Sequence, residues 1–204
     1  LYPSKQNLHF MILKVYKRML KVHGHQNWWP VSGFTEPKEW EICIGVILTQ
    51  NTSWTNVEKA LLNLRNANCR TVDDMLKMDI RKLRKLVNPA GFFNQKAKRL
   101  KTFAGYVIDS FGSVENFLKS ATREDLLNVN GVGNETADSM LLYACGKPYF
   151  VVDAYTRRIF SRLGIIDPTS EYEQVKELFE NSIPKDIKVY REFHALIVKH
   201  AKEC

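Results

Sequence analysis

Apolar residues recur along most of the chain at the three-to-four-residue spacing of amphipathic helices. This spacing predicts helices over residues 5–22, 54–67, 95–111, 153–163 and 170–181, and from 188 to the end. The apolar run within residues 40–50 is too short for its periodicity to separate a helix from a buried strand. Proline and glycine fall between these segments, and no alternating strand pattern extends beyond residues 149–152. The sequence therefore predicts an all-α protein.

Length and composition indicate a globular chain. The 204 residues suffice for one large domain or two small lobes with a sizeable core. With 45% apolar and 25% charged residues, disordered and collagen-like classes are excluded. No apolar run approaches the roughly 18–20 residues of a membrane-spanning helix. The first twenty residues carry lysines throughout instead of the apolar centre of a signal peptide. We expect an intracellular protein, cytoplasmic or nucleoid-associated, with no membrane partner.

The charge distribution favours a polyanionic partner. The formal net charge is +8. One stretch holds as many basic side chains as the whole net charge, with no acid among them: Arg81, Lys82, Arg84, Lys85, Lys96, Lys98, Arg99 and Lys101. A solvated helix face would normally alternate the signs of its charges. The stretch therefore favours nucleic acid, although charge alone does not exclude a plain solvated surface.

The cysteines give no sign of a metal site. Cys43, Cys69, Cys145 and Cys204 are far apart, and none belongs to a Cys-x-x-Cys or Cys-x-x-His pair. An intracellular chain keeps such thiols reduced. We therefore expect no bound metal.

Residues 122–146 form the most informative motif, a predicted helix-hairpin-helix. Thr122 and Asp125 have the spacing of a capping box at the start of the first helix. Gly131 and Gly133 bracket one apolar residue in the turn, where glycine allows a positive φ. Backbone N–H groups at the start of the second helix are suited to bind a phosphate. The alternative is an ordinary helical hairpin, because Gly-x-Gly by itself is weak evidence.

Residues 127–137 resemble the helix-hairpin-helix of the endonuclease III superfamily of DNA glycosylases. In that family a catalytic aspartate follows the hairpin in a Val-Asp segment, and residues 151–157 (VVDAYTR) take that place. Residues 48–52 (LTQNT) resemble the segment whose glutamine fills the gap left by a flipped base. Residues 90–98 resemble the family's Gly-aromatic-Asn-x-Lys-Ala loop, which inserts a wedge beside the opened pair. These matches occur in the family's order along nearly the whole chain.

The resemblance implies a two-lobed helical glycosylase with an active-site cleft between its domains. One lobe, of residues 30–149, would be a helical barrel that ends in the hairpin. The other would join residues 1–29 to residues 150–204. The partner implied is damaged double-stranded DNA, bound by a monomer.

The expected DNA contacts come from the hairpin, the two matching loops and the basic stretch. They are Gln50, Phe92, Lys96, Lys98, Asn130, Gly131, Val132, Gly133 and Asn134. The resemblance implies that Gln50 fills the vacated space and that Phe92 is the wedge. From the residues alone, Gln50 is a polar helix end and Phe92 a loop aromatic folded into the core.

Asp153 is the catalytic residue that the resemblance implies. Breaking an N-glycosidic bond builds positive charge on the sugar, and a nearby ionised carboxylate stabilises that charge. The N-terminus of the next predicted helix favours the ionised form of Asp153. The same position suits a helix N-cap, and the two roles are compatible.

Two departures from the family pattern narrow the expected chemistry. Family members that also cut the strand carry a lysine two residues after the second hairpin glycine, where this chain has Glu135. A glutamate forms no imine with the sugar, so we expect a monofunctional enzyme. Lys96 or Lys199 could replace that lysine only in a rebuilt pocket.

The second departure concerns a cofactor. Many relatives end in four cysteines that hold an iron–sulfur cluster. This chain lacks their spacing, and Cys204 stands about where the first ligand would fall. One thiolate does not hold a cluster, so no cofactor is expected of the chain as given. Cys204 could be a first ligand only if the C-terminus is trimmed.

A Trp-Trp-Pro segment at Trp28, Trp29 and Pro30, with Trp54 after the LTQNT segment, resembles the 3-methyladenine DNA glycosylase III family. That likeness implies an aromatic pocket that stacks a flipped, alkylated purine. Core packing is the commonest fate of such tryptophans. The alternatives are a same-fold glycosylase for mismatched uracil or thymine, for oxidised or for deaminated bases, and a non-catalytic DNA-binding protein that uses the hairpin alone.

Overall fold

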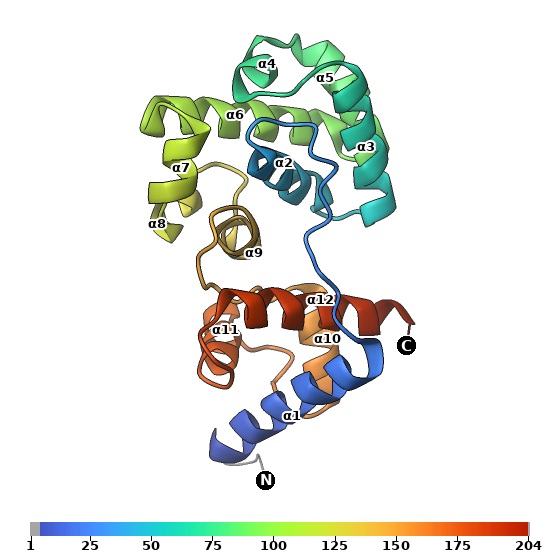
Figure 1. Ribbon diagram of the computed structural model, residues 1–204, viewed down its shortest axis with the longest axis vertical. Coiled ribbons are helices and arrows are strands. Elements are labelled where there is room, and N and C mark those ends of the chain that lie inside the picture. Colours follow the sequence, from blue (N-terminus) through green and yellow to red (C-terminus); the bar gives the residue numbers. More distant parts are fainter. Residues whose placement is uncertain (1–4, 204) are drawn as a thin grey trace. The chain divides into compact units, whose positions relative to one another are not determined.

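The computed structural model describes residues 5–203 of the chain, and Figure 1 shows its helices in order. The helices are α1 (Lys5–His23), α2 (Lys38–Thr49), α3 (Trp54–Asn66), α4 (Val72–Lys77), α5 (Ile80–Val87), α6 (Phe93–Phe111), α7 (Val114–Ser120), α8 (Arg123–Leu127), α9 (Asn134–Ser139), α10 (Ala154–Arg162), α11 (Tyr172–Glu180) and α12 (Ile187–Glu203). A 3₁₀ turn, η1 (Asn88–Ala90), precedes α6, and a π-helical turn, η2 (Met140–Ala144), continues α9. No strand occurs among the described residues, so the all-α prediction is confirmed.

The chain divides into two compact units. The terminal unit joins residues 1–30 to residues 146–204, and the central unit comprises residues 31–145. Each unit has buried apolar residues from several helices, and each is described by itself below.

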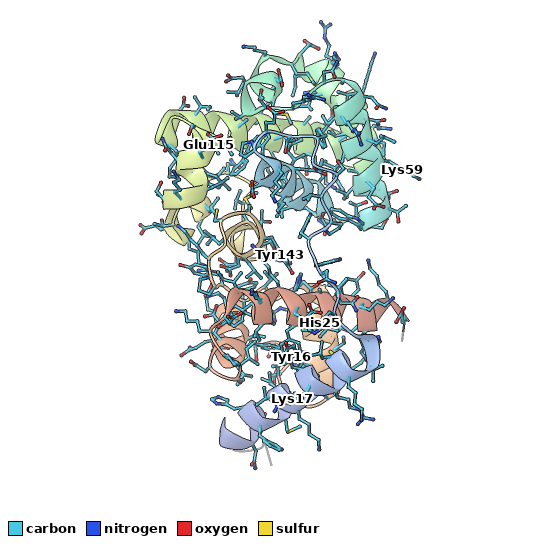
Figure 2. The ribbon with its side chains drawn as sticks, viewed as in Figure 1. Tyr16, Lys17, His25, Lys59, Glu115 and Tyr143 are labelled. Atoms are coloured by element: carbon cyan, nitrogen blue, oxygen red, sulfur yellow. The ribbon has the colours of Figure 1, made fainter. Side chains whose placement is uncertain are left out.

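The terminal unit is built on packed aromatic rings. Helix α12 packs against α1 and α10. The Phe179 ring lies 4.7 Å from those of Phe150 and Phe160, and Phe193 of α12 lies 5.8 Å from it. Tyr16 of α1, labelled in Figure 2, packs on Phe193 with ring centroids 5.0 Å apart. Phe150 begins the buried segment 150–152, which leads directly into Asp153.

Helix α2 forms the centre of the central unit. Residues 40–48 are all buried, so the ambiguous apolar run is a buried helix packed against α3, α6 and η2. The indole of Trp40 stacks on Phe103 of α6 at 5.6 Å. The buried carboxylate of Glu41 accepts hydrogen bonds from three consecutive N–H groups, those of residues 32–34. The Glu41 carboxylate therefore ties residues 32–34, which precede α2, to the helix itself.

A partly buried ion pair links the two helices of the helix-hairpin-helix. Arg123 of α8 donates to both carboxylate oxygens of Asp138 on α9, at 2.7 and 3.3 Å. Thr122 and Asp125 form the predicted capping box at the start of α8. Val132, at the tip of the turn, is buried. The hairpin is therefore fixed from both helices and from its tip.

The two hairpin glycines differ in conformation. Gly131 has a φ of +90°, as expected for a turn glycine. Gly133 was also expected to need a positive φ, and this was wrong. Its φ is −97° and its ψ −178°, an extended conformation open to any residue. A Cβ at Gly131 would lie 2.7 Å from the Arg99 side chain, whereas one at Gly133 would meet nothing within 4 Å.

None of the helices in residues 5–203 is long and apolar enough to span a membrane.

Candidate active site

Asp153 is the N-cap of α10. Its Oδ1 accepts two hydrogen bonds from Thr156, one from the backbone N–H and one from the hydroxyl, both at 2.7 Å. The carboxyl is 12% exposed, so it is largely removed from water while retaining an open edge. The N-cap that the sequence predicted is therefore present, and it occupies only one oxygen of the Asp153 carboxylate.

The second oxygen of Asp153 faces a histidine from α12. His194 places Nε2 3.5 Å from Oδ2 of Asp153, and its own side chain is 7% exposed. Burial raises the pKa of Asp153, but the hydrogen bonding and charge of His194, together with the donors of Thr156, outweigh burial. The net result is a pKa below the ordinary value, so Asp153 is ionised at neutral pH.

The same histidine contacts the first of the paired tryptophans. The rings of Trp28 and His194 are 5.9 Å apart with an interplanar angle of 57°. Trp29 lies 5.7 Å from Trp28, and both indoles are half-buried, while Pro30 is exposed. Within the terminal unit, the structure thus places Trp28, His194 and Asp153 in one continuous row.

His194 was not found from the sequence. It occurs within the apolar segment 193–198, all buried, and a polar residue at such a position is the available signal. A lone histidine in an apolar run is compatible with ordinary core packing, so the sequence alone gave no reason to select it.

In the central unit, the side chain of Gln50 is bound to the hairpin. Its Nε2 donates to the carbonyl of Gly131 at 3.1 Å and to the hydroxyl of Thr136 at 3.0 Å. Arg99 of α6 donates to its Oε1. All the hydrogen-bonding atoms of the Gln50 amide are therefore engaged, and they join the end of α2 to the hairpin and α6.

Phe92 is displayed on the surface and not folded into the core. It follows Gly91 in a left-handed conformation, with a φ of +44°, and precedes α6. Its side chain is 62% exposed. A left-handed conformation is uncommon for a bulky residue such as Phe92. Residues 88–94 are called the Phe92 loop below.

Lys96, expected to contact DNA, is instead a structural residue. It is 1% exposed, and its ammonium donates to the carbonyls of Leu48 at 2.9 Å and Ala90 at 2.7 Å. Burial, and secondarily the charge of Arg99, lower its pKa from 10.5 to about 8. The amphipathic stem and helical spacing of Lys96 do not reveal this burial, because one of the two carbonyls belongs to Leu48, 48 positions away in the chain.

The side chains of the basic stretch therefore differ in exposure, and not all of them are available to a partner. Lys101 also points inward, donating to the carbonyls of Leu76 and Met78. Lys98, Arg81, Lys82 and Lys85 are exposed.

The remaining predicted residues lie on the central unit. Trp54, the first residue of α3, is half-buried. In the hairpin, Asn130 and Glu135 are exposed and Asn134 is half-buried.

No group of three or more His, Cys, Asp and Glu side chains in residues 5–203 is arranged to hold a metal ion. Cys204, the position compared with a cluster ligand, lies outside the described residues.

Comparison with known proteins decides the family. Residues 44–185 match the HhH-GPD superfamily of base excision DNA repair proteins, a span that includes the hairpin and Asp153. The chain belongs to the HhH-GPD superfamily. It is therefore a member of the DNA glycosylase family of base excision repair, and the predicted resemblance to the endonuclease III superfamily is confirmed.

Two curated relatives cover most of this HhH-GPD protein. A putative DNA repair glycosylase of Methanocaldococcus jannaschii is 48% identical over 98% of the chain and 90% of its own length. Endonuclease III of Thermotoga maritima is 30% identical over 74% of the chain and 68% of its own length.

Solved structures give the same fold. The 3-methyladenine DNA glycosylase of H. pylori, solved with 1,N6-ethenoadenine bound, matches with a TM-score of 0.81 and 34% identity over 96% of this chain and 97% of that chain. A trapped covalent endonuclease III–DNA intermediate matches with a TM-score of 0.78 over 96% of this chain and 85% of that chain. At 21% identity, this second match shows the fold alone.

Proposed function

We propose that this protein is a monofunctional DNA glycosylase that removes 3-methyladenine or a related alkylated purine from double-stranded DNA. The observation that carries the proposal is the row of Trp28, His194 and the ionised Asp153 in the terminal unit. The likeness to the H. pylori 3-methyladenine DNA glycosylase supports the choice of substrate class.

The proposed chemistry needs one carboxylate. As the glycosidic bond breaks, positive charge builds on the sugar, and ionised Asp153 stabilises it while orienting or deprotonating the attacking water. A 3-methylated adenine already carries positive charge and leaves without a dedicated acid to protonate it. This matches a site in which Asp153 is held in its ionised form.

Aromatic faces select the cationic base in this proposal. Trp28 or Trp29 and Trp54 are the side chains assigned to stack a flipped purine. A cationic ring over an indole gains about 2 kcal/mol when desolvated, a gain that neutral adenine lacks.

Strand cleavage is not part of the proposed activity, because Glu135 occupies the lysine position of the strand-cleaving relatives. The product is an intact strand with an abasic site. Each step is assigned to side chains of this chain and none to a metal or cofactor.

DNA is held by the central unit in this proposal. The hairpin, residues 130–134, and exposed Lys98 meet phosphates, while Phe92 is the wedge. Gln50 is assigned to the vacated space, and its bonds to Gly131 and Thr136 make its position depend on the hairpin. A monomer acting on intracellular DNA suffices for these roles.

The proposal is tested with a set of duplexes, each carrying one lesion. Released base and strand breaks are scored separately, with and without alkali, and borohydride trapping is run in parallel. We expect release of 3-methyladenine, strand breaks only after alkali, and no trapped complex. Release of uracil, thymine or 8-oxoguanine without 3-methyladenine would refute the substrate assignment, and efficient trapping would refute the monofunctional one.

A further inference from the structure

His194 lies between two groups to which the proposed function assigns different tasks. One side of its ring faces the carboxylate of Asp153, with 3.5 Å between Nε2 and Oδ2. Its ring also packs against the indole of Trp28 at 5.9 Å. A single buried imidazole on α12 thus contacts both the carboxylate and the aromatic wall.

The two oxygens of Asp153 are supported differently. Oδ1 is fixed by two short hydrogen bonds from Thr156, a residue three positions later in the same helix. These bonds are local and cap α10. Oδ2 faces another helix, so its surroundings depend on tertiary packing of α12 against α10.

Three ionisable groups on or beside the helices packed against α12 contact groups other than His194. They pair as follows: His25 with the Glu192 carboxylate at 3.5 Å, Arg157 with the carbonyl of Ser170 at 2.7 Å, and Arg158 with the carbonyl of Ala201 at 2.9 Å. On α1, Tyr16 packs on Phe193. Figure 2 labels Tyr16 and His25 beside α12. Asp153 is the carboxylate that the structure places against the His194 ring.

We propose that His194 is a positioning residue that orients Oδ2 of Asp153 and packs against the indole of Trp28. One imidazole thereby fixes the carboxylate relative to the tryptophan that is proposed to stack the flipped base. This inference rests on the proposed function, since it assigns Asp153 and Trp28 the roles given above. His194 does not touch the substrate in this account. It acts through Asp153, by the 3.5 Å contact between Nε2 and Oδ2, and through the face of Trp28.

Two substitutions separate the two tasks. His194→Phe keeps an aromatic ring against Trp28 and removes the donor to Asp153. His194→Gln keeps a side-chain N–H donor and removes the ring. In H194F we expect base release at pH 7 to fall about ten- to a hundredfold, the usual consequence of losing a hydrogen bond to a charged group. The DNA concentration for half-saturation stays unchanged, because the DNA contacts lie elsewhere.

The pH profile distinguishes positioning from simple structural support. Removing the donor raises the pKa of Asp153, so the acid limb of the release rate in H194F moves to higher pH. H194Q keeps a donor but loses the charge of His194, so its acid limb should move less than that of H194F, while its tryptophan fluorescence changes and its preference for 3-methyladenine over adenine falls. An H194F variant that loses stability without moving the acid limb would overturn the proposal. An H194Q variant with unaltered fluorescence and preference would do the same.

A carboxyl NMR titration keeps this inference separate from the proposed function. The ¹³C resonance of Asp153, identified by its absence in Asp153→Asn, gives its pKa without any substrate. A raised pKa in H194F supports the role of His194 even if no lesion is released, in which case the proposed function alone fails. An unchanged pKa overturns the role of His194 whatever the protein releases.

The unsubstituted protein supplies a test that does not depend on the folding of any variant at position 194. The ring resonances of His194 should respond at the pH where Asp153 titrates, and D153N should abolish that response. Asparagine remains a good N-cap, so α10 is retained in this control. If the chemical shifts of the His194 ring did not change as Asp153 titrates, the proposed contact would be contradicted.

Discussion

The two units hold their candidate functional groups in different ways. In the terminal unit, Asp153 is fixed by a local cap and one histidine from another helix. In the central unit, the hairpin is fixed by an ion pair to a buried carboxylate, by a buried tip and by hydrogen bonds to the Gln50 amide. The first arrangement tunes the charge state of a carboxylate. The second makes a rigid backbone surface.

This difference predicts that chemistry and DNA binding are separable by substitution. Changes around Asp153 should alter the rate of base release and leave affinity intact. Changes in the hairpin should alter stability or affinity. The following experiments test that separation, beginning with the largest expected effect.

Arg123→Met should lower the free energy of unfolding by about 3–5 kcal/mol, because it leaves the buried carboxylate of Asp138 without its principal counter-ion. Urea denaturation gives the value. Lys119→Met, an exposed lysine on α7, removes the same formal charge and serves as the control. Equal stability losses in the two variants would show that the ion pair does not hold the hairpin.

Gly131→Ala and Gly133→Ala should differ although only one residue separates them. Alanine at 131 would take a positive φ and meet Arg99, so we expect a stability loss of about 1–3 kcal/mol. Alanine at 133 has free space and an extended backbone, so stability should be unchanged. If the hairpin binds phosphate as proposed, the Cβ of alanine at position 133 would stand at that contact and should weaken binding to all DNA sequences alike. Equal melting temperatures for the two variants would contradict the first expectation, and unaltered DNA affinity of G133A the second.

Stability should rise with pH as a result of buried Lys96. The folded protein releases this proton near pH 8, whereas the unfolded chain holds it to about 10.5. Between these values the unfolded state binds more protons, so the folded state gains about 1–3 kcal/mol as the pH rises. Denaturant unfolding at several pH values measures this gain. Lys96→Met, which does not titrate, should lose that slope even though it leaves two carbonyls unpaired. The same slope in both proteins would refute this account of Lys96.

Lys98→Gln should have the smallest effect. Loss of one phosphate contact reduces the salt dependence of binding, the slope of log K against log salt, by about 1. Fluorescence anisotropy with an undamaged duplex at several salt concentrations measures the slope. Glutamine at exposed Lys59, labelled in Figure 2 on α3, is a matched control for a lysine outside the hairpin and the basic stretch. An unchanged slope in K98Q would remove Lys98 from the DNA contacts.

The sequence predicts most of the longer helices because their apolar spacing is regular, whereas it does not identify the short helices α4, α5 and α7. The stripe in residues 95–111 marks α6, which spans Phe93–Phe111. The capping box of Thr122 and Asp125 involves residues three positions apart, so the sequence predicts it equally well. Residues 40–50 were ambiguous because a helix buried on all sides has no polar face to give it a period.

What the sequence missed depends on contacts between distant residues. The sequence does not distinguish Lys96 from an exposed lysine. Its burial depends on the fold, in which α2 and the Phe92 loop each provide a carbonyl that accepts a hydrogen bond from its ammonium. The contact of His194 with Asp153 joins positions 41 residues apart, and no local pattern encodes it. Gly133 resembled a turn glycine because a motif lists residue types and leaves φ undetermined.

The most direct test of the separation between chemistry and binding is single-turnover release of 3-methyladenine by the unsubstituted protein and by Asp153→Asn, at saturating enzyme. The account predicts a fall on the order of 10³-fold in the release rate, the scale for removing preorganised charge stabilisation. The dissociation constant for abasic DNA, measured on the same samples, should stay within about twofold, since phosphate contacts dominate affinity. A release rate that survives the substitution would contradict the assignment of Asp153 and, with it, the division of labour between the two units.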